Sequence, residues 1–232
     1  MNEKNIFRYE RKFIIGANLI ENIEDLESYL SIHLNEAFDQ RGINSIYYDT
    51  PNYKFANETA EGSLNRQKVR IRFYGDLDKF IFPQLEIKSK IGLVGTKEVI
   101  KLQKDELYEN NFLLRNLHKL NIKNREASCL ITAIEPKVIV TYKRKYFISS
   151  CKKYRFTLDS NIGFKLFDRN YPNQSLNYDL IYPYNKKILE LKYDVNDEVL
   201  VNRIIKNLPF RLTSFSKYLT ALRYIGLSNY IL

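Results

Sequence analysis

Alternation of apolar and polar residues dominates this chain and constrains its fold more than any other feature. Successive side chains of a β-strand point to opposite faces of the sheet, so a period of two predicts strands with one apolar face. The pattern recurs over residues 7–15, 43–48, 68–74, 80–89, 96–103, 137–148, 154–159 and 187–193. Apolar residues three or four apart predict helices over 18–33, 105–120, 197–208 and 214–225. The sequence therefore predicts an α+β fold with an antiparallel sheet.

Length and composition favour one folded domain spanning residues 1–232. Of the 232 residues 44% are hydrophobic, and no linker rich in Gly, Ser or Pro divides the chain. The two cysteines lack the spacing of a zinc site and the first ten residues lack the apolar core of a signal sequence, so we expect a cytoplasmic protein without a disulfide framework. The formal net charge of +10 favours a polyanionic partner, such as nucleic acid, an acidic membrane or a phosphorylated small molecule.

Most predicted strands carry charged side chains on one face. Residues two apart share a face, and these groups are Arg8, Glu10 and Lys12; Lys68, Arg70 and Arg72; Glu86, Lys88 and Lys90; Tyr142 and Arg144; Arg155, Thr157 and Asp159; and Glu190 and Lys192. On any single strand, such a face is typical of an antiparallel sheet with water on one side. Together, however, the groups hold ten cations and four carboxylates, and like charges on neighbouring strands repel. A bound anion with several charges would offset that repulsion, so we expect a basic interior and an apolar exterior covered by amphipathic helices.

The carboxylates on these faces have two interpretations. Glu10, Glu86 and Glu190 are either salt-bridge partners of the cations or oxygen ligands for Mg²⁺ or Mn²⁺. Other chemistries have less support, since the chain has no GxxxxGK[ST], GxGxxG or HExxH motif. Its 18 Tyr and 14 Phe mostly occupy apolar strand positions, so we expect no specific nucleic-acid partner.

Nine short motifs resemble, in their order along the chain, those of the VTC polyphosphate polymerase domain. They are RYERKF, NSIYYDT, KVRIRFYG, LEIKSK, GTKE, PKVIVTYKRKYF, RFTLDSNI, ILELKYD and SFSKY. That family belongs to the triphosphate tunnel metalloenzymes, within the CYTH-like superfamily. The resemblance implies an eight-stranded antiparallel barrel whose tunnel has a basic interior, with helices around it and a C-terminal helix at one mouth.

The resemblance also implies roles for individual residues. Phosphoryl-transfer roles fall on Arg70, Arg72, Lys88, Arg144, Arg155 and Lys217. Substrate-binding roles fall on Arg8, Lys12, Lys68, Lys97, Tyr142, Lys192 and Ser216. Metal-binding roles for Mn²⁺ or Mg²⁺ fall on Glu190, Glu10 and Glu86.

The resemblance implies a polymerase that moves the γ-phosphoryl group of ATP onto a growing polyphosphate chain and releases ADP. Arg8 stands where tunnel triphosphatases and class IV cyclases have a first glutamate, which favours the polymerase branch. Two alternatives stay open: a tunnel triphosphatase, and a non-catalytic module that binds polyphosphate or an inositol phosphate. The expected partners are ATP and polyphosphate, with an inositol phosphate regulator and a separate membrane protein as further partners that the family suggests.

Overall fold

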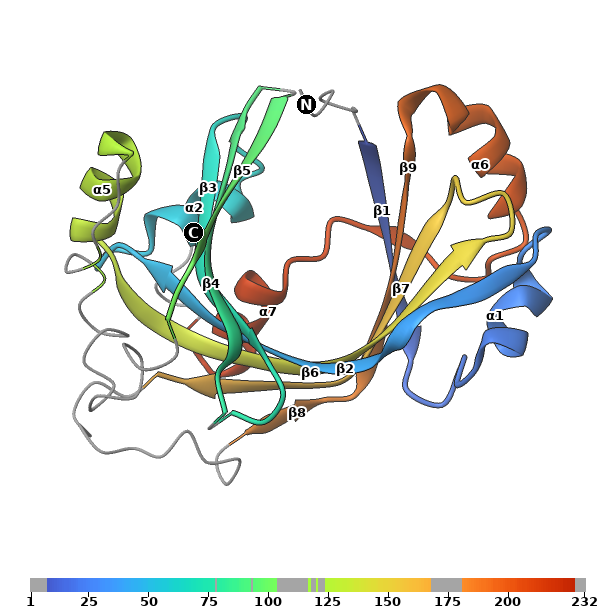
Figure 1. The fold of residues 1–232 in the computed structure, drawn as a ribbon, viewed down its shortest axis with the longest axis horizontal. Coiled ribbons are helices and arrows are strands. Elements are labelled where there is room, and N and C mark those ends of the chain that lie inside the picture. Colours follow the sequence, from blue (N-terminus) through green and yellow to red (C-terminus); the bar gives the residue numbers. More distant parts are fainter. Residues whose placement is uncertain are drawn as a thin grey trace. The chain divides into compact units, whose positions relative to one another are not determined.

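The computed structural model describes residues 8–77, 79–92, 94–103, 117, 120, 124–167 and 181–227. Its ten strands form one sheet in the order β10-β1-β9-β7-β6-β2-β3-β4-β5, with β8 paired to β7 (Figure 1). The strands are β1 (Arg8–Gly16), β2 (Leu34–Asp49), β3 (Arg66–Tyr74), β4 (Ile81–Ile91), β5 (Val94–Lys101), β6 (Glu135–Ser149), β7 (Arg155–Leu166), β8 (Tyr182–Tyr184), β9 (Lys186–Asp194) and β10 (Leu212–Thr213). The described helices are α1 (Ile23–Tyr29), α2 (Lys54–Ala60), α5 (Arg125–Thr132), α6 (Glu198–Ile204) and α7 (Lys217–Tyr224), with a 3₁₀ turn, η3, at Val195–Asp197.

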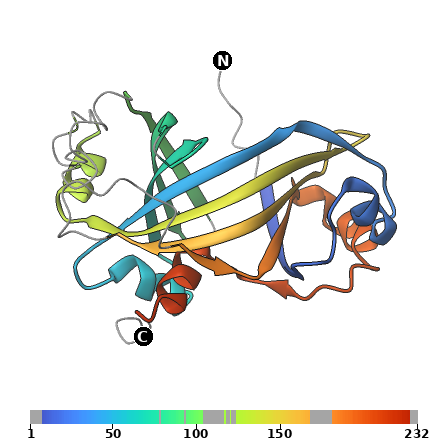
Figure 2. The same cartoon turned by 90° about the horizontal axis from the view of Figure 1, so that it is seen from below.

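The chain divides into two compact units. Unit 1 comprises residues 1–41, 142–162 and 184–215, and unit 2 comprises residues 42–141, 163–183 and 216–232. The three longest strands, β2, β6 and β7, contribute residues to both units and are neighbours in the sheet (Figure 2). The single domain expected from the sequence stays a prediction.

Each unit has its own apolar core, built from the alternate positions of its strands. In unit 2, Val69, Ile71 and Phe73 of β3 are fully buried. Helices α2 and α5 add Phe55 and Ile131 to the same core. The charged residues of β3 therefore lie on the opposite face of the strand, as the period of two predicts.

Unit 1 repeats this arrangement. Leu189 and Leu191 of β9 are fully buried in a core to which α1 contributes Leu26 and α6 contributes Val201. Helices thus cover apolar strand faces in both units, although those in the core of unit 2 were not predicted, and the predicted α+β class is confirmed.

All eight predicted strand segments form strands, but two strands were missed. Strands β8 and β10 have three and two residues, too few to show a period of two. The sheet therefore has ten strands instead of eight, and the described strands follow an open path instead of a closed one.

The helices were predicted less completely. Helices α1, α6 and α7 fall inside predicted segments but are shorter, whereas α2 and α5 were not predicted. Both missed helices have seven or eight residues, so their apolar period covers barely two turns. The predicted helix at 105–120 lies outside the described residues, apart from Leu117 and Leu120. None of the described helices is long and apolar enough to cross a membrane.

Candidate functional site

In unit 2, a buried carboxylate gathers three of the cations predicted for the site. Glu86 on β4 is 1% exposed, and Arg70 on the neighbouring strand β3 pairs with it. Arg70 Nε donates to Glu86 Oε2 at 2.8 Å, and Lys97 Nζ on β5 donates to Oε1 at 2.7 Å. Arg72 Nη1 lies 3.5 Å from Oε1. Burial raises the pKa of Glu86, but Arg70 and Lys97 outweigh it, so the pKa lies below its ordinary value and the carboxylate is ionised at neutral pH.

The Arg72 guanidinium retains an unused donor. Its Nε is buried and has no hydrogen-bond partner among the described residues. The same holds for Oγ of Ser45, the residue paired with Arg72 across β2 and β3. Buried polar atoms normally have hydrogen-bond partners. Two atoms on paired residues that lack a partner in the described part of the chain, Arg72 Nε and Ser45 Oγ, therefore favour a polar ligand at this position.

Lys97 of this cluster also belongs to a row of three lysines. Lys68, Lys88 and Lys97 are paired across β3, β4 and β5. Like charges placed directly opposite one another destabilise a sheet, and an anion bound across the row would offset that cost.

Helix α7 brings a further predicted cation into unit 2. Ser216 caps the helix by accepting from the Leu219 amide, and its hydroxyl also accepts from Lys68 Nζ at 3.1 Å. Lys217 is the first residue of the helix and is partly exposed.

In unit 1, a second buried carboxylate lies among cations. Glu190 on β9 is 6% exposed, and Lys192 Nζ lies 2.8 Å from its Oε1. Glu10 on β1 shares Lys192, at 3.5 Å, and also pairs with Lys12 at 2.7 Å. Burial raises the pKa of Glu190, but Lys192, Arg144 and Lys12 lower it far below its ordinary value. Both carboxylates are therefore acceptors at neutral pH, because the pKa of Glu10 is lowered as well.

Arg144 is fixed by a bidentate ion pair. Its Nε and Nη2 donate to the two carboxylate oxygens of Asp159 at 2.5 and 2.8 Å, and Asp159 is fully buried. The guanidinium also lies over the Tyr142 ring, with 5.3 Å between Cζ and the ring centroid. Burial lowers the pKa of Arg144, but Asp159, Tyr142 and Glu190 together raise it above its ordinary value, so the charge is retained.

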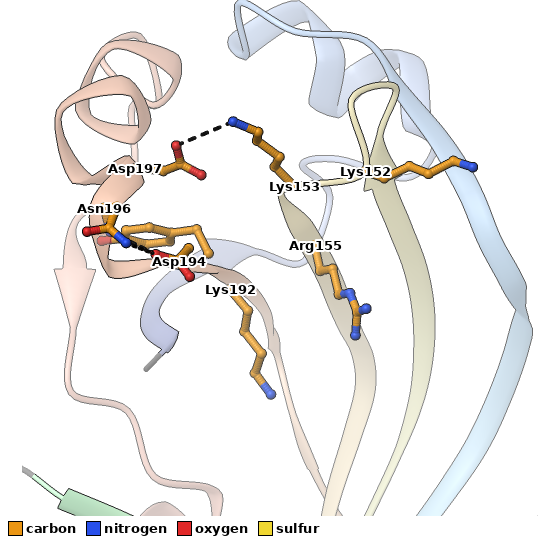
Figure 3. A pocket seen from close by; sticks show the side chains of 8 residues that line it. Lys152, Lys153, Arg155, Lys192, Asp194, Asn196 and Asp197 are labelled. Carbon is orange, nitrogen blue, oxygen red and sulfur yellow. Dashed lines mark hydrogen bonds and ion pairs between the residues drawn. The ribbon is translucent and has the colours of Figure 1, made fainter. Parts of the chain in front are cut away.

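A cavity of about 410 Å³ opens in unit 1 between β7, β9 and the turn after β6 (Figure 3). Its lining residues are Lys152, Lys153, Arg155, Lys192, Tyr193, Asp194, Asn196 and Asp197. Arg155 and Lys192 point in the same direction, away from Asp197, which pairs with Lys153 at 3.8 Å (Figure 3). Arg155 is exposed and has no ion-pair or hydrogen-bond partner in the described part of the chain.

The carboxylates of unit 1 could contribute to a divalent metal site but could not complete one. Among the described residues no group of three or more His, Cys, Asp or Glu is placed to hold a metal. Glu10 and Glu190 lie on paired strands, and the buried Oγ1 of Thr157, opposite Glu190, has no partner in the described ranges. Mg²⁺ and similar hard cations commonly bind one or two carboxylates and take further ligands from phosphate and water, so this donor set fits such an ion. Glu86, the third predicted ligand, lies in unit 2 with the arginines.

Comparison with known proteins identifies the family. The sequence model of the VTC domain matches residues 7–225. The chain belongs to the VTC domain family. No curated protein matches it in sequence.

Two solved structures are similar to this VTC domain. One is the Hippeastrum protein HpAC1, described as having a dominant triphosphatase activity, with a TM-score of 0.56 and 12% identity over 93% of this chain and 96% of that one. Another is the PH1819 protein of Pyrococcus horikoshii, with a TM-score of 0.48 and 12% identity over 94% and 99% of the two chains. At this identity the first likeness shows a shared fold.

The structure of the VTC domain thus distributes the predicted residues over two clusters. Unit 2 holds Lys68, Arg70, Arg72, Glu86, Lys88, Lys97, Ser216 and Lys217. Unit 1 holds Arg8, Glu10, Lys12, Tyr142, Arg144, Arg155, Glu190 and Lys192. For Arg8 only the backbone is described, paired with Asp194.

Three residues that sequence reasoning left without a role take part in these clusters. Asp159 holds Arg144, while Tyr47 accepts a hydrogen bond from Arg70 Nη1 at 3.0 Å. Tyr218 follows Lys217 and is buried. The period of two places Ser45 and Tyr47 on one face of β2, but only the register with β3 puts Tyr47 opposite Arg70.

Proposed function

We propose that this VTC domain is a metal-dependent polyphosphate polymerase. The γ-phosphoryl group of ATP would pass to a terminal oxygen of a polyphosphate chain, with cleavage of the bond to the β,γ-bridging oxygen and release of ADP. The main support is the set of cations around two ionised, buried carboxylates in a chain of this family, with a buried Arg72 Nε that lacks a partner among the described residues.

In this mechanism the protein supplies position and positive charge. Phosphoryl transfer needs little covalent chemistry from the enzyme, and its transition state spreads charge over the equatorial phosphate oxygens. Arg70 and Arg72 would donate to those oxygens from β3, held in place by Glu86. The acceptor is an ionised phosphate oxygen, so no strong general base is required.

The cations of unit 1 form a separate cluster that would also bind phosphate groups. On unit 1, Arg144 is held rigidly by Asp159, whereas Arg155 is unpaired among the described residues and available to an anion. Glu10 and Glu190 would hold Mn²⁺ or Mg²⁺ together with substrate phosphates. When bound, such an ion would neutralise negative charge on the phosphates.

A tunnel triphosphatase is the second candidate. The shared fold with the Hippeastrum protein, which is described as a triphosphatase, favours it. Both reactions use the same cations and differ in whether water or a phosphate chain accepts the phosphoryl group. A module that binds polyphosphate or inositol phosphate without turnover is a third candidate.

Incubation of the protein with ATP and Mn²⁺ distinguishes the three candidate functions. We expect a ladder of polyphosphate on a gel and release of ADP, both lost in Arg72→Ala. Inorganic phosphate without longer chains would favour the triphosphatase and contradict the polymerase. Binding of tripolyphosphate with no turnover would favour the non-catalytic module.

A further inference from the structure

Within unit 2, hydrogen bonds connect helix α7 to strands β3 and β2 through the two residues that flank Lys217. On one side, Ser216 accepts from Lys68 Nζ of β3 at 3.1 Å. On the other side, the Tyr218 hydroxyl donates to Asp49 Oδ2, at the end of β2, at 2.8 Å. Tyr218 is 1% exposed and Asp49 is fully buried. Lys217 is thus the residue between two anchored neighbours.

Tyr47 connects this anchor to Arg70. The Tyr47 ring stacks on the Tyr218 ring, with centroids 5.2 Å apart and planes 15° from parallel. Its hydroxyl accepts from Arg70 Nη1 at 3.0 Å, while Arg70 Nε binds Glu86. Tyr47 is 5% exposed. The two rings therefore form a continuous, buried path from the start of α7 to the Arg70 guanidinium.

Asp49, which accepts the hydrogen bond of Tyr218, is itself held in place by backbone amides. Its carboxylate also accepts from the amides of Thr50, Phe55 and Ala56, at 2.7 to 2.9 Å, and so fixes the start of α2. Burial and Asp49 raise the pKa of Tyr218 well above its ordinary value, so its hydroxyl remains a donor at any working pH. A hydrogen bond to an ionised carboxylate is shorter and stronger than one between neutral groups, so it holds Tyr218 firmly.

We propose that Tyr47 and Tyr218 are positioning residues that hold Arg70 and Lys217 in a fixed arrangement for a phosphate-chain ligand. Tyr47 acts through Arg70, and Tyr218 acts through Lys217. The proposal rests on the proposed function only in that the ligand is an oligophosphate. Neither tyrosine touches that ligand in this scheme, so each effect must disappear when the cation it serves is removed.

The alternative is that the tyrosines only pack the core. A packing role would lower stability without a specific effect on the ligand. The hydroxyl groups make the distinction possible, because Tyr→Phe keeps the ring and its stacking and removes one hydrogen bond.

The experiment compares three Tyr→Phe variants by calorimetric binding of inorganic tripolyphosphate and by the KM and kcat of polymer formation. Tyr47→Phe and Tyr218→Phe remove the two hydrogen bonds of the path. Tyr224→Phe is the matched control, because Tyr224 lies at the other end of α7 and donates to the Pro183 carbonyl at 3.0 Å. Thermal unfolding and circular dichroism of each variant check that it folds.

We expect Tyr47→Phe to weaken tripolyphosphate binding by roughly tenfold. The variant loses the hydrogen bond to the charged Arg70, and the free energy of such a bond corresponds to about a tenfold change in a dissociation constant. In an Arg70→Ala background the same change should have no further effect. Tyr218→Phe should behave likewise in a Lys217→Ala background, and Tyr224→Phe should bind like the wild type.

Two results would overturn the proposal: tripolyphosphate affinities of Tyr47→Phe and Tyr218→Phe equal to that of Tyr224→Phe, or effects that persist undiminished in the alanine backgrounds. A wild type that binds tripolyphosphate but forms no polymer would contradict the polymerase. The binding constants would then still decide the positioning role.

Discussion

At the scale of single residues, the notable feature is that buried carboxylates are kept ionised by surrounding cations. Glu86 and Glu190 are both nearly inaccessible, one in each unit. Glu86 pairs with Arg70 and Lys97, whereas Glu190 pairs with Lys192 and its pKa is lowered further by Arg144 and Lys12. Removing one partner of a buried pair leaves an uncompensated charge, which costs far more than the intact pair contributes. Charge changes at these positions should therefore have large effects.

The depressed pKa of Glu190 predicts acid-dependent stability. An unfolded Glu has a pKa of 4.5, and in the folded protein that value is lowered. The stabilisation is therefore complete above the unfolded pKa and is lost as the pH falls below it towards the folded pKa. We expect the free energy of unfolding, measured in urea, to fall more steeply below pH 4.5 in wild type than in Glu190→Gln. Equal slopes would contradict this assignment.

The bidentate pair of Arg144 and Asp159 predicts a large stability effect. Asp159 is fully buried, so Asp159→Ala leaves the Arg144 charge without its partner and should cost about 3–5 kcal/mol in urea denaturation. The control is Asp76→Ala, which breaks an exposed pair with Lys79 that spans 2.6 Å. An exposed pair contributes little, so this variant should unfold like wild type. A comparable loss in both variants would show that burial is not the deciding factor.

At the scale of elements, two helices with side-chain N-caps allow a matched comparison. Asn22 caps α1 in a capping box with Asp25, and Ser216 caps α7 while also binding Lys68. Asn22→Ala and Ser216→Ala should each cost about 1 kcal/mol of stability. Only Ser216→Ala should weaken tripolyphosphate binding, because only α7 carries a cation of the candidate site. If Asn22→Ala weakened binding equally, the effect would be one of stability.

Long and short elements differ in how well the sequence predicts them. Strands such as β3 were predictable because Val69, Ile71 and Phe73 alternate with cations over a full strand length. Gly92, directly after β4, takes a positive φ of 58°, a conformation that favours glycine. Short elements such as β10 and α2 carry too few residues for a period to emerge.

The candidate site was predictable in its composition but not in its pairing. Sequence assigns charged residues to one face of a strand, yet the partner across the sheet depends on register. Arg70 opposite both Glu86 and Tyr47 follows from two registers that no single strand reveals. Asp159 and Tyr218 were missed for the same reason, since their partners are distant in sequence.

At the scale of the whole molecule, the net charge of +10 makes attraction to any polyanion an expectation, so the oligophosphate ligand must be distinguished from nucleic acid. Binding to duplex DNA through exposed cations releases condensed counterions and falls roughly a thousandfold or more between about 50 and 200 mM salt when several phosphates are contacted. Arg70, Arg72 and Arg144 are instead largely buried, with side chains 11–15% exposed, where salt screens less.

We therefore expect the affinity for random DNA to collapse over this range of salt, while tripolyphosphate binding declines much less. Titrations of both ligands at each salt concentration, by fluorescence anisotropy for DNA and calorimetry for tripolyphosphate, measure the two slopes. Arg72→Ala should weaken tripolyphosphate binding and leave the DNA slope unchanged, because Arg72 is withdrawn from the surface that a duplex could touch. Tight DNA binding that survives 200 mM salt, or equal slopes for the two ligands, would favour a nucleic-acid partner over an oligophosphate.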